Sequence, residues 1–516
     1  MEERIARLVE ESTKLLDIED AEVAEMHAAL SEAPLSDLVT AGYALAELRV
    51  VSTKPFVAGN VLVVLEPLSA QADLSQSIFA MGDMVSVTTC SGGGRQYNQG
   101  DWATQHPALA TVRYIAETKV TVVISSPKHA PRPPSICSMK MAASSAMVQR
   151  IRSALSSLAL CTNRPQLHYV LFGERTPSFI PLGRFDVLDQ SLNHGQRAAV
   201  RLAVSAVDVA LIHGPPGTGK TQVLVEAIRQ LVAQNKRLLV CGASNVAVDC
   251  IADCLIKVGD ISIVRIGSPA KIRSSVLDHS LAKQMTYFAK ERMDVNKDPV
   301  VSETLREREK AMREALYAKT NAERMNIIGA SDVVLSTLNG AGGRDVAGFS
   351  FDVVVVDEAT QSTEAECWIA AHKAPKIIMA GDPHQLSPMV RSPARNQHAG
   401  GAAHAAANHL AGASTMFERV KDMLGDSVCH MLQIQYRMNA CVMEPSSTEL
   451  YGGQLVADPS VADHVLSDLP RVRPTPDTIK PLVFIDTSGA GMTESTLELE
   501  LAGLANCRRI AEAAKT

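Results

Sequence analysis

A glycine-rich stretch in the middle of the chain has the residue types and spacing of a phosphate-binding loop. Gly214-Pro215-Pro216-Gly217-Thr218-Gly219-Lys220-Thr221 fits the pattern G-x-x-x-x-G-K-[ST], the Walker A loop. Its glycines let the backbone turn tightly, so that several N–H groups point into one concavity. Lys220 can reach the β and γ phosphates of a nucleoside triphosphate, and the Thr221 hydroxyl can ligate Mg²⁺. We assign all eight residues to nucleotide binding.

The flanking residues favour this interpretation over a chance glycine turn. Asp208 to Ile212 is a short apolar run that predicts a buried strand, and Gln222 to Val232 predicts a helix. A helix that begins at the loop adds the positive end of its dipole where the phosphates would lie. The order strand, glycine loop, helix is the context that the motif requires.

An acidic pair follows a second apolar strand. Phe351 to Val356 is unbroken by polar residues except Asp352, and Asp357-Glu358 come directly after it. Such a strand would deliver both carboxylates to the edge of the sheet beside the phosphate loop. Asp357 would hold Mg²⁺ through its water shell, and Glu358 would orient and deprotonate the attacking water. The position at the end of an apolar strand makes this pair a strong signal.

Two later stretches are less specific. Gln385, in the run 381–388 after a further strand, could touch the γ-phosphate, although an ordinary Asp-Pro turn is equally compatible with that run. In the run Gln435-Tyr436-Arg437-Met438, the arginine could reach the γ-phosphate and the tyrosine ring could stack on a base. A surface Tyr-Arg pair is the alternative.

Strands and helices alternate through the middle of the chain, which indicates a parallel sheet. Between about residues 274 and 326 the rhythm is interrupted, and the charged run 303–323 predicts a solvated helix. Residues 391–414 contain three histidines, but their Ala and Gly content favours a flexible loop over a metal site. The predicted strands are Val209–Ile212, Leu238–Cys241, Ile263–Ile266, Asp332–Ser336, Val353–Val356 and Ile377–Ala380.

The first third of the chain has a different pattern. Residues 2–30 predict an amphipathic helix and residues 141–160 a second one, with short β-rich runs between them that end at the prolines after Ala130. Short strands at this spacing suggest a small barrel, and the two helices would form a stalk that carries it. The β-rich runs are Leu48–Val51, Val61–Leu65, Met84–Thr88, Thr111–Ile115 and Val120–Ser125.

Composition limits the classes of protein. The chain has 516 residues, 46% hydrophobic and 21% charged, which fits a globular protein of several domains. Its net charge of −6 does not indicate a nucleic-acid partner, although a local groove can still be basic. Ten cysteines without a C-x-x-C pair, and the lack of a long apolar stretch, predict a protein of the nucleus or cytoplasm with no membrane contact.

Together the motifs resemble superfamily 1 helicases, and more narrowly the immunoglobulin-mu-binding (Smubp) and nonsense-decay helicases. The similar stretches are LNHGQ, HGPPGTGKT, SNVAVD, VVVVDEAT, GDPHQLSP and QYRM, in that order. The resemblance implies that Gln196 recognises adenine and Tyr436 stacks on it. Gln385 and Arg437 would contact the γ-phosphate and join Lys220 and Glu358 in catalysis. It further implies that Ser244, Asn245 and Thr337 grip the nucleic-acid backbone.

The resemblance also implies an architecture and an activity. The fold would be α/β, a P-loop RecA-like parallel sheet with an inserted small β-barrel on a helical stalk and a partial second RecA-like domain. The expected activity is Mg²⁺- and ATP-dependent unwinding of DNA or RNA, with 5′-to-3′ movement on single strands. The protein would act as a monomer whose partners are ribonucleoprotein, replication or translation factors. The expected domains are 1–45 (stalk helix), 46–130 (barrel), 131–172 (stalk helix), 173–430 (first RecA-like domain) and 431–516 (partial second domain).

The sequence departs from the family pattern in several places. Gly242-Ala243 stands where Ala-Pro is usual, His384 where Lys is common, and Asn439 where His is common. After Arg437 we expect a helix at 439–450, one strand at 482–486 and a last helix at 496–514. The family's later motifs, including a second arginine finger, are not in this sequence, so we expect truncation within the second domain. The alternative function is therefore a module that binds ATP and single strands with little turnover.

Overall fold

The computed structural model describes residues 1–40, 42–69, 74, 78–89, 107–116, 118–125, 129–142, 146–286, 321–389 and 415–484. The chain divides into two compact units. The sheet unit consists of Met1–Asp17, Met147–Ile266 and Arg324–Thr487, and the barrel unit of Ile18–Ala146, Gly267–Glu323 and Ser488–Thr516. None of the helices among the described residues is long and apolar enough to cross a membrane.

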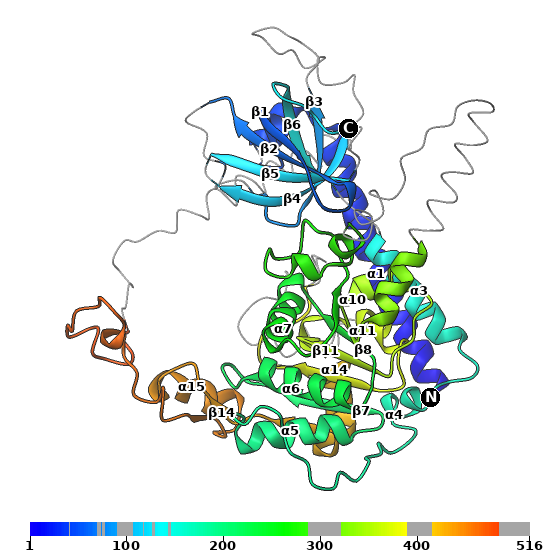
Figure 1. Cartoon of the computed structure of the whole chain (residues 1–516), viewed down its shortest axis with the longest axis vertical. Helices are drawn as coiled ribbons and strands as arrows, with labels where there is room; N and C mark the ends of the chain where they lie inside the picture. Colours follow the sequence, from blue (N-terminus) through cyan, green and yellow to red (C-terminus); the bar gives the residue numbers. More distant parts are fainter. Residues whose placement is uncertain are drawn as a thin grey trace, which may run out of the picture. The chain divides into compact units, whose positions relative to one another are not determined.

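The core of the sheet unit is a seven-stranded parallel sheet (Figure 1). Its spatial order is β13-β7-β12-β11-β8-β10-β9, so β7, which precedes the phosphate loop, and β11, which precedes the acidic pair, are separated by one strand. The central strands are apolar and buried on both faces, as parallel strands covered by helices must be. The strands are β7 Val209–His213, β8 Leu238–Gly242, β9 Ile263–Arg265, β10 Val333–Thr337, β11 Val353–Asp357, β12 Ile377–Gly381 and β13 Cys429–Met431.

The strand register brings the chemically interesting residues to one edge of this sheet. Gly381 of β12 lies opposite His213 of β7, and Gly242 of β8 lies opposite both Asp357 of β11 and Thr337 of β10. Neighbouring strands are about 4.8 Å apart, so β7 and β11 end within about 10 Å of each other. The carboxyl edge of a parallel sheet is where α/β proteins bind ligands.

Helices pack along the sheet in two groups. α5, α6 and α7 lie side by side, and α10, α11 and α14 form a second packed row (Figure 1). After β13 a short parallel pair, β14 (Ile434–Gln435) and β15 (Val456–Ala457), flanks α15. The helices of the unit whose two ends both lie among the described residues are the first part of α1 Glu2–Glu32, α3 Ala146–Leu160, α4 Gln166–Leu171, α5 His194–Ser205, α6 Lys220–Ala233, α7 Asn245–Val258, α10 Leu338–Ala341, α11 Glu364–Ala371, α14 Met416–Leu424 and α15 Ala440–Leu450.

The barrel unit is a closed six-stranded antiparallel barrel with the order β1-β2-β5-β4-β3-β6. Alternate residues of its strands point inward and form one apolar core that includes Leu48, Val63, Val112 and Val122. Helix α2 (Leu35–Thr40) precedes it. The strands are β1 Ala44–Pro55, β2 Val61–Pro67, β3 Met84–Thr89, β4 Ala108–Ala116, β5 Lys119–Ile124 and β6 Ile136–Met141.

The predicted fold class is confirmed: a parallel sheet of RecA-like order and a small closed barrel are both present. The strand prediction for the barrel stopped too early, because Ile136–Met141 forms β6, which pairs with both β1 and β3 and closes the barrel. The second predicted helix therefore begins at Ala146, not 141. The domain boundaries remain predictions.

The predicted strand at 482–486 is wrong for the part that the structure describes, since residues 482–484 lie outside any strand. The helix predicted from Asn439 to Leu450 is confirmed as α15. The loop at 391–414, the helix at 496–514 and residues 303–320 of the charged run lie outside the described residues.

Candidate nucleotide and nucleic-acid site

The phosphate loop has the backbone that its glycines predict. Gly217 and Gly219 adopt left-handed conformations with φ of +75° and +79°, which side chains disfavour. Gly219 is the N-cap of α6, which begins at Lys220, so the unpaired N–H groups of the first helical turn face the loop. A side chain at Gly214 would lie 2.9 Å from Lys220 Cβ. Loop and helix start together form a ready site for an anion.

The acidic pair meets the loop lysine. Lys220 Nζ donates to Glu358 Oε1 at 2.5 Å and lies 3.8 Å from Asp357 Oδ1. Burial raises the pKa of Asp357 to about 6, Lys220 opposes that rise, and the charge of Glu358 adds to it. The acidic pair after β11 and the lysine at the start of α6 thus form one ionic cluster. A triphosphate between them would take over the lysine as partner.

Glu358 also has an unusual backbone. Its φ of +54° and ψ of +42° place a non-glycine residue in the left-handed region, directly after β11. Such a conformation costs of order 1 kcal/mol and persists where the surroundings enforce it. It turns the chain so that Asp357 and Glu358 both point toward Lys220, and Gln361 Nε2 donates to Glu358 Oε2 at 3.1 Å.

The donors near the lysine fit Mg²⁺. Asp357 supplies a buried carboxylate whose pKa is raised by that burial, and Thr221 supplies a hydroxyl in the first turn of α6. Hard oxygen donors in small number suit Mg²⁺, which keeps several waters and takes further ligands from phosphates. Among the described residues, no group of three or more His, Cys, Asp or Glu could hold a metal by itself.

Gln196 links the start of α5 to the phosphate loop. Its side chain accepts from Asn193 N at 2.9 Å in a capping box, and its Nε2 donates to Thr218 O at 3.0 Å. The residue is only 2% exposed. Asn193 Nδ2 in turn donates to Tyr436 Oη at 2.9 Å, so the residues predicted to recognise adenine and to stack on it are joined through Asn193.

Gln385 is attached to Asp382 rather than free. Its Nε2 donates to Asp382 Oδ2 at 2.7 Å, and Asp382 also accepts from His213 of β7 and from the Tyr451 hydroxyl. Burial alone would raise the pKa of Asp382, but hydrogen bonds from His213, Gln385 and Tyr451 lower it to about 2. Gln385, which is predicted to contact the γ-phosphate, is therefore hydrogen-bonded in this structure to a charged, fully buried carboxylate.

The Gln435–Met438 segment lies directly against the phosphate loop. Tyr436 N donates to Gly217 O at 2.9 Å, and a side chain at Gly217 would come within 2.5 Å of Arg437 Cβ. Gln435 is fully buried, and its Oε1 accepts from the N–H groups of Arg437 and Met438. The exposed Arg437 side chain is thus placed at the loop by a buried glutamine beneath it.

The three residues predicted to hold nucleic acid lie at other strand ends of the same edge. Ser244 follows β8 and caps α7 by accepting from Ala247 N, and Thr337 ends β10 and caps α10 by accepting from Gly340 N. Asn245 Oδ1 accepts from Arg265 Nη2 at 2.9 Å. All three have structural roles as well as polar atoms near the surface. They are separate from the lysine and the acidic pair.

Comparisons with known proteins identify the relatives of this chain. Residues 9–119 match the helicase SMUBP-2/HCS1 1B domain, and residues 191–324, 289–393 and 413–514 match AAA domains. The chain is 34% identical over 499 residues to the DNA polymerase alpha-associated DNA helicase A of Schizosaccharomyces pombe, which covers 92% of this chain and 72% of that protein. The chain belongs to the SMUBP-2/HCS1 helicase family.

Other relatives match between 58% and 95% of this chain. The DNA-binding protein SMUBP-2 of Mesocricetus auratus is 34% identical over 95% of this chain, and the match covers 50% of that protein. The ATP-dependent helicase upf1 of Schizosaccharomyces pombe is 32% identical over 58% of this chain and 31% of its own length. The chain thus spans about half the length of the SMUBP-2 proteins that it matches.

The SMUBP-2/HCS1 pattern led to the residues at the phosphate loop but not to those that support them. Asn193 stands inside the stretch LNHGQ and Gln435 inside QYRM, so their place in these motifs was the signal available. Arg265 forms a fully buried pair with Asp249 at 2.8 Å and also holds Asn245. Asp249 ends the SNVAVD stretch four residues after Asn245, which is one helical turn and places both on one side of α7.

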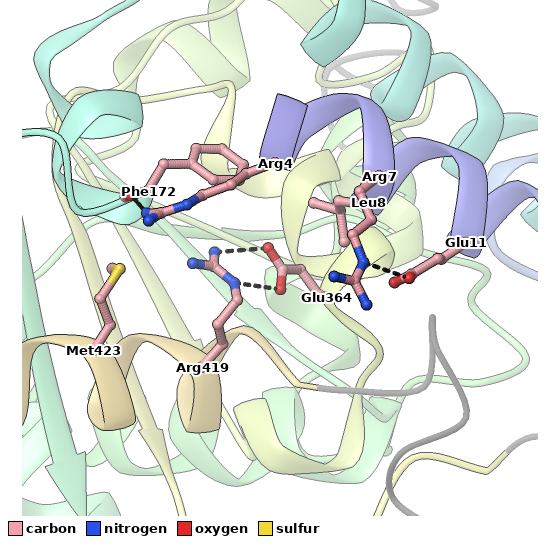
Figure 2. Close-up of a pocket in the computed structure, with 8 residues that line it drawn as sticks. All are labelled: Arg4, Arg7, Leu8, Glu11, Phe172, Glu364, Arg419 and Met423. Carbon is pink, nitrogen blue, oxygen red and sulfur yellow. Dashed lines mark hydrogen bonds and ion pairs between the residues drawn. The ribbon is translucent and has the colours of Figure 1, made fainter. Parts of the chain in front are cut away.

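A pocket of about 410 Å³ lies elsewhere in the SMUBP-2/HCS1 sheet unit (Figure 2). Arg419 and Glu364 form a two-pronged ion pair there, and the Arg419 guanidinium lies 5.0 Å from the centre of the Phe172 ring. Arg4 donates to Phe172 O, and Arg7 pairs with Glu11. Since these charges satisfy one another and no residue of the phosphate loop lines the pocket, we regard it as a structural contact between α1, α11 and α14.

Proposed function

We propose that this protein is an ATP-dependent helicase or translocase that moves along single-stranded DNA or RNA in the 5′-to-3′ direction. The single observation that carries the proposal is the ionic cluster in which Lys220 Nζ lies 2.5 Å from Glu358 Oε1 and 3.8 Å from Asp357 Oδ1, at the mouth of a glycine loop. A lysine between two acids at a helix start is suited to receive a triphosphate.

The residues have separate roles in the proposed reaction. The loop N–H groups and Lys220 bind the β and γ phosphates and hold them in the geometry needed for in-line attack. Glu358 orients the attacking water and takes its proton. Asp357 and Thr221 would hold Mg²⁺, which would supply positive charge to the phosphate oxygens. Arg437, already packed against Gly217, has only a short path to the γ-phosphate.

Adenine would lie toward the start of α5. Gln196 Nε2 donates one hydrogen to Thr218 O, and its second hydrogen is available for the base. Tyr436 is 38% exposed, which leaves part of its ring for stacking. Ser244, Asn245 and Thr337 are proposed contacts to the phosphates of the polynucleotide, because they present short polar side chains at helix starts.

The relatives support a setting for this activity. The Schizosaccharomyces pombe protein is named for association with DNA polymerase alpha, and the Mesocricetus auratus protein for DNA binding. By analogy we propose a nuclear or cytoplasmic protein that works as a monomer with replication, translation or ribonucleoprotein factors. Stacking and backbone contacts are chemically tolerant of both DNA and RNA.

The test is ATP hydrolysis with and without single-stranded DNA or RNA. We expect strong stimulation by a single strand, and a Glu358→Gln variant that still binds ATP but hydrolyses it at least about 100-fold more slowly. Lys220→Ala should weaken ATP binding as well as turnover. Directional movement is then measured by unwinding of duplexes with a 5′ or a 3′ single-stranded tail.

The outcomes separate the two candidate functions. ATP binding without stimulated turnover would favour the alternative, a module that holds ATP and a single strand. Full hydrolysis by Glu358→Gln would remove the role of Glu358 as base. Unchanged ATP affinity in Lys220→Ala would remove the phosphate-loop assignment on which both candidates depend.

A further inference from the structure

Tyr451, a residue outside all six motif stretches, contacts the carboxylate that holds Gln385. It follows the last residue of α15, and its hydroxyl donates to Asp382 Oδ2 at 2.8 Å. Gln385 Nε2 donates to the same oxygen at 2.7 Å. Tyr451 is 5% exposed and Asp382 fully buried, so solvent does not compete for this contact. Two donors from different segments therefore share one acceptor atom.

The Asp382 carboxylate has no acceptor capacity to spare. Its Oδ1 accepts from His213 Nε2 at 3.2 Å and from His384 N at 3.1 Å, and its Oδ2 accepts from Gln385 and Tyr451. A carboxylate has about four lone-pair sites, and four donors occupy them. Each added donor withdraws charge from the oxygens and weakens the hold on the others, so the Tyr451 bond makes Gln385 easier to release.

The ring of Tyr451 lies beside the rings of His213 and His384 and also belongs to an apolar cluster. It packs with Met443 and Leu455, and partly buried Met431 and Met438 lie against this group. Met438 is the last residue of the Gln435–Met438 segment, whose neighbour Arg437 lies at Gly217. Tyr451 thus contacts the carboxylate that holds Gln385 through its hydroxyl, and it belongs to the apolar cluster against which Met438 packs.

We propose that Tyr451 is a positioning residue that couples Gln385 to the segment carrying Arg437. This inference rests on the proposed ATPase function and deepens it. When ATP is bound, Gln385 turns from Asp382 to the γ-phosphate, and Tyr451 keeps Asp382 charged and in place. A shift of α15 and of the Gln435–Met438 segment changes the Tyr451 contact and so changes how firmly Asp382 retains Gln385.

The test is Tyr451→Phe, which removes the hydroxyl and leaves the ring in its apolar cluster. We expect kcat of single-strand-stimulated ATP hydrolysis to fall about tenfold with little change in KM, since a hydrogen bond to a charged group is worth roughly that factor. The matched control is Tyr169→Phe, a hydroxyl deletion in α4, where the ring packs on Arg175 with 4.5 Å between the guanidinium carbon and the ring centre. Its kcat and KM should equal those of the wild type.

A double variant distinguishes coupling from a general structural effect. If Tyr451 acts through Gln385, Tyr451→Phe should have no further effect on kcat in a Gln385→Ala background. Additive losses in the double variant, or an unchanged kcat in Tyr451→Phe, would overturn the inference. Since the wild-type protein and Glu358→Gln are measured beside them, absence of any stimulated hydrolysis in the wild type would instead count against the proposed function itself.

Discussion

Gly217 offers a direct test of how closely the phosphate loop and the Gln435–Met438 segment pack. An alanine there would have φ of +75°, and its Cβ would lie 2.5 Å from Arg437 Cβ and 3.2 Å from Arg437 N. Relief to an ordinary contact requires a separation of about 1 Å, which also disrupts the Tyr436 N to Gly217 O hydrogen bond of 2.9 Å. The effect on Arg437 should therefore come from displaced backbone.

The expected magnitude has two parts. The left-handed conformation costs an alanine about 1–2 kcal/mol, and the lost hydrogen bond about 1 kcal/mol more. Together we expect Gly217→Ala to lose roughly 2–3 kcal/mol of local stability. A displacement of Arg437 by about 1 Å should lower kcat about 100-fold, because phosphoryl transfer depends on positioning.

Two other glycines separate these contributions. Gly348 has φ of +82° and no atom within 4 Å of the position that a Cβ would take, so Gly348→Ala should show the conformational cost alone. Gly329 is helical with nothing within 4 Å, so Gly329→Ala should be neutral or stabilising by up to about 1 kcal/mol. Neither residue is part of the proposed site, and both variants should keep wild-type ATP turnover.

The measurements are thermal unfolding midpoints and ATP hydrolysis of the three variants side by side. We expect the midpoint to fall in the order Gly329→Ala, Gly348→Ala, Gly217→Ala, and turnover to fall only in the last. If Gly217→Ala matches Gly348→Ala in both assays, the close contact between the two segments does not exist in solution, and the reasoning about Arg437 is refuted.

Three further predictions concern the supporting residues. Gln435→Leu should lower ATP turnover at least about tenfold, because it leaves buried backbone groups unpaired; wild-type turnover would contradict that role. Arg265→Leu should cost about 3–5 kcal/mol by removing the positive charge that pairs with the buried Asp249 carboxylate, and adding Asp249→Leu should recover much of it; thermal unfolding showing equal losses in both variants would oppose this. Burial lowers the pKa of His168 from 6.5 to about 4, so the unfolded chain binds more protons than the folded protein between these pH values. The free energy of unfolding should therefore decline by about 3 kcal/mol as pH falls from about 6.5 toward 4. His168→Leu should flatten that part of the pH profile of unfolding, and an unchanged profile would reject the assignment.

The sequence was most informative where a buried apolar strand leads directly into residues that can do chemistry. The predicted strands Val209–Ile212 and Val353–Val356 each differ from the observed β7 and β11 by one terminal residue, because a continuous apolar run has only one way to be buried in a parallel sheet. Lys220 and Glu358 then meet because both follow such strands. Local pattern was enough for the centre of the site.

It was least informative where a contact joins distant segments. Tyr451 and Asp382 are 69 residues apart, and nothing in either neighbourhood predicts their hydrogen bond. The strand that closes the barrel was missed because the prolines before Ile136 suggested that the β region ends there. Ile136–Met141 forms a strand nevertheless, because it pairs with the edges of β1 and β3 that would otherwise be unpaired. Such pairings depend on the topology of the whole unit.

The connection between β13 and the Gln435–Met438 segment limits how that segment can travel. Leu432 is anchored, since its N–H donates to His213 O at 2.8 Å and its side chain is 1% exposed. From Leu432 to Tyr436 there are four residues, a tether of at most about 14 Å when extended. The backbone of Arg437, the next residue, can therefore move only a short way from a point that is bonded to β7, the strand that leads into the phosphate loop.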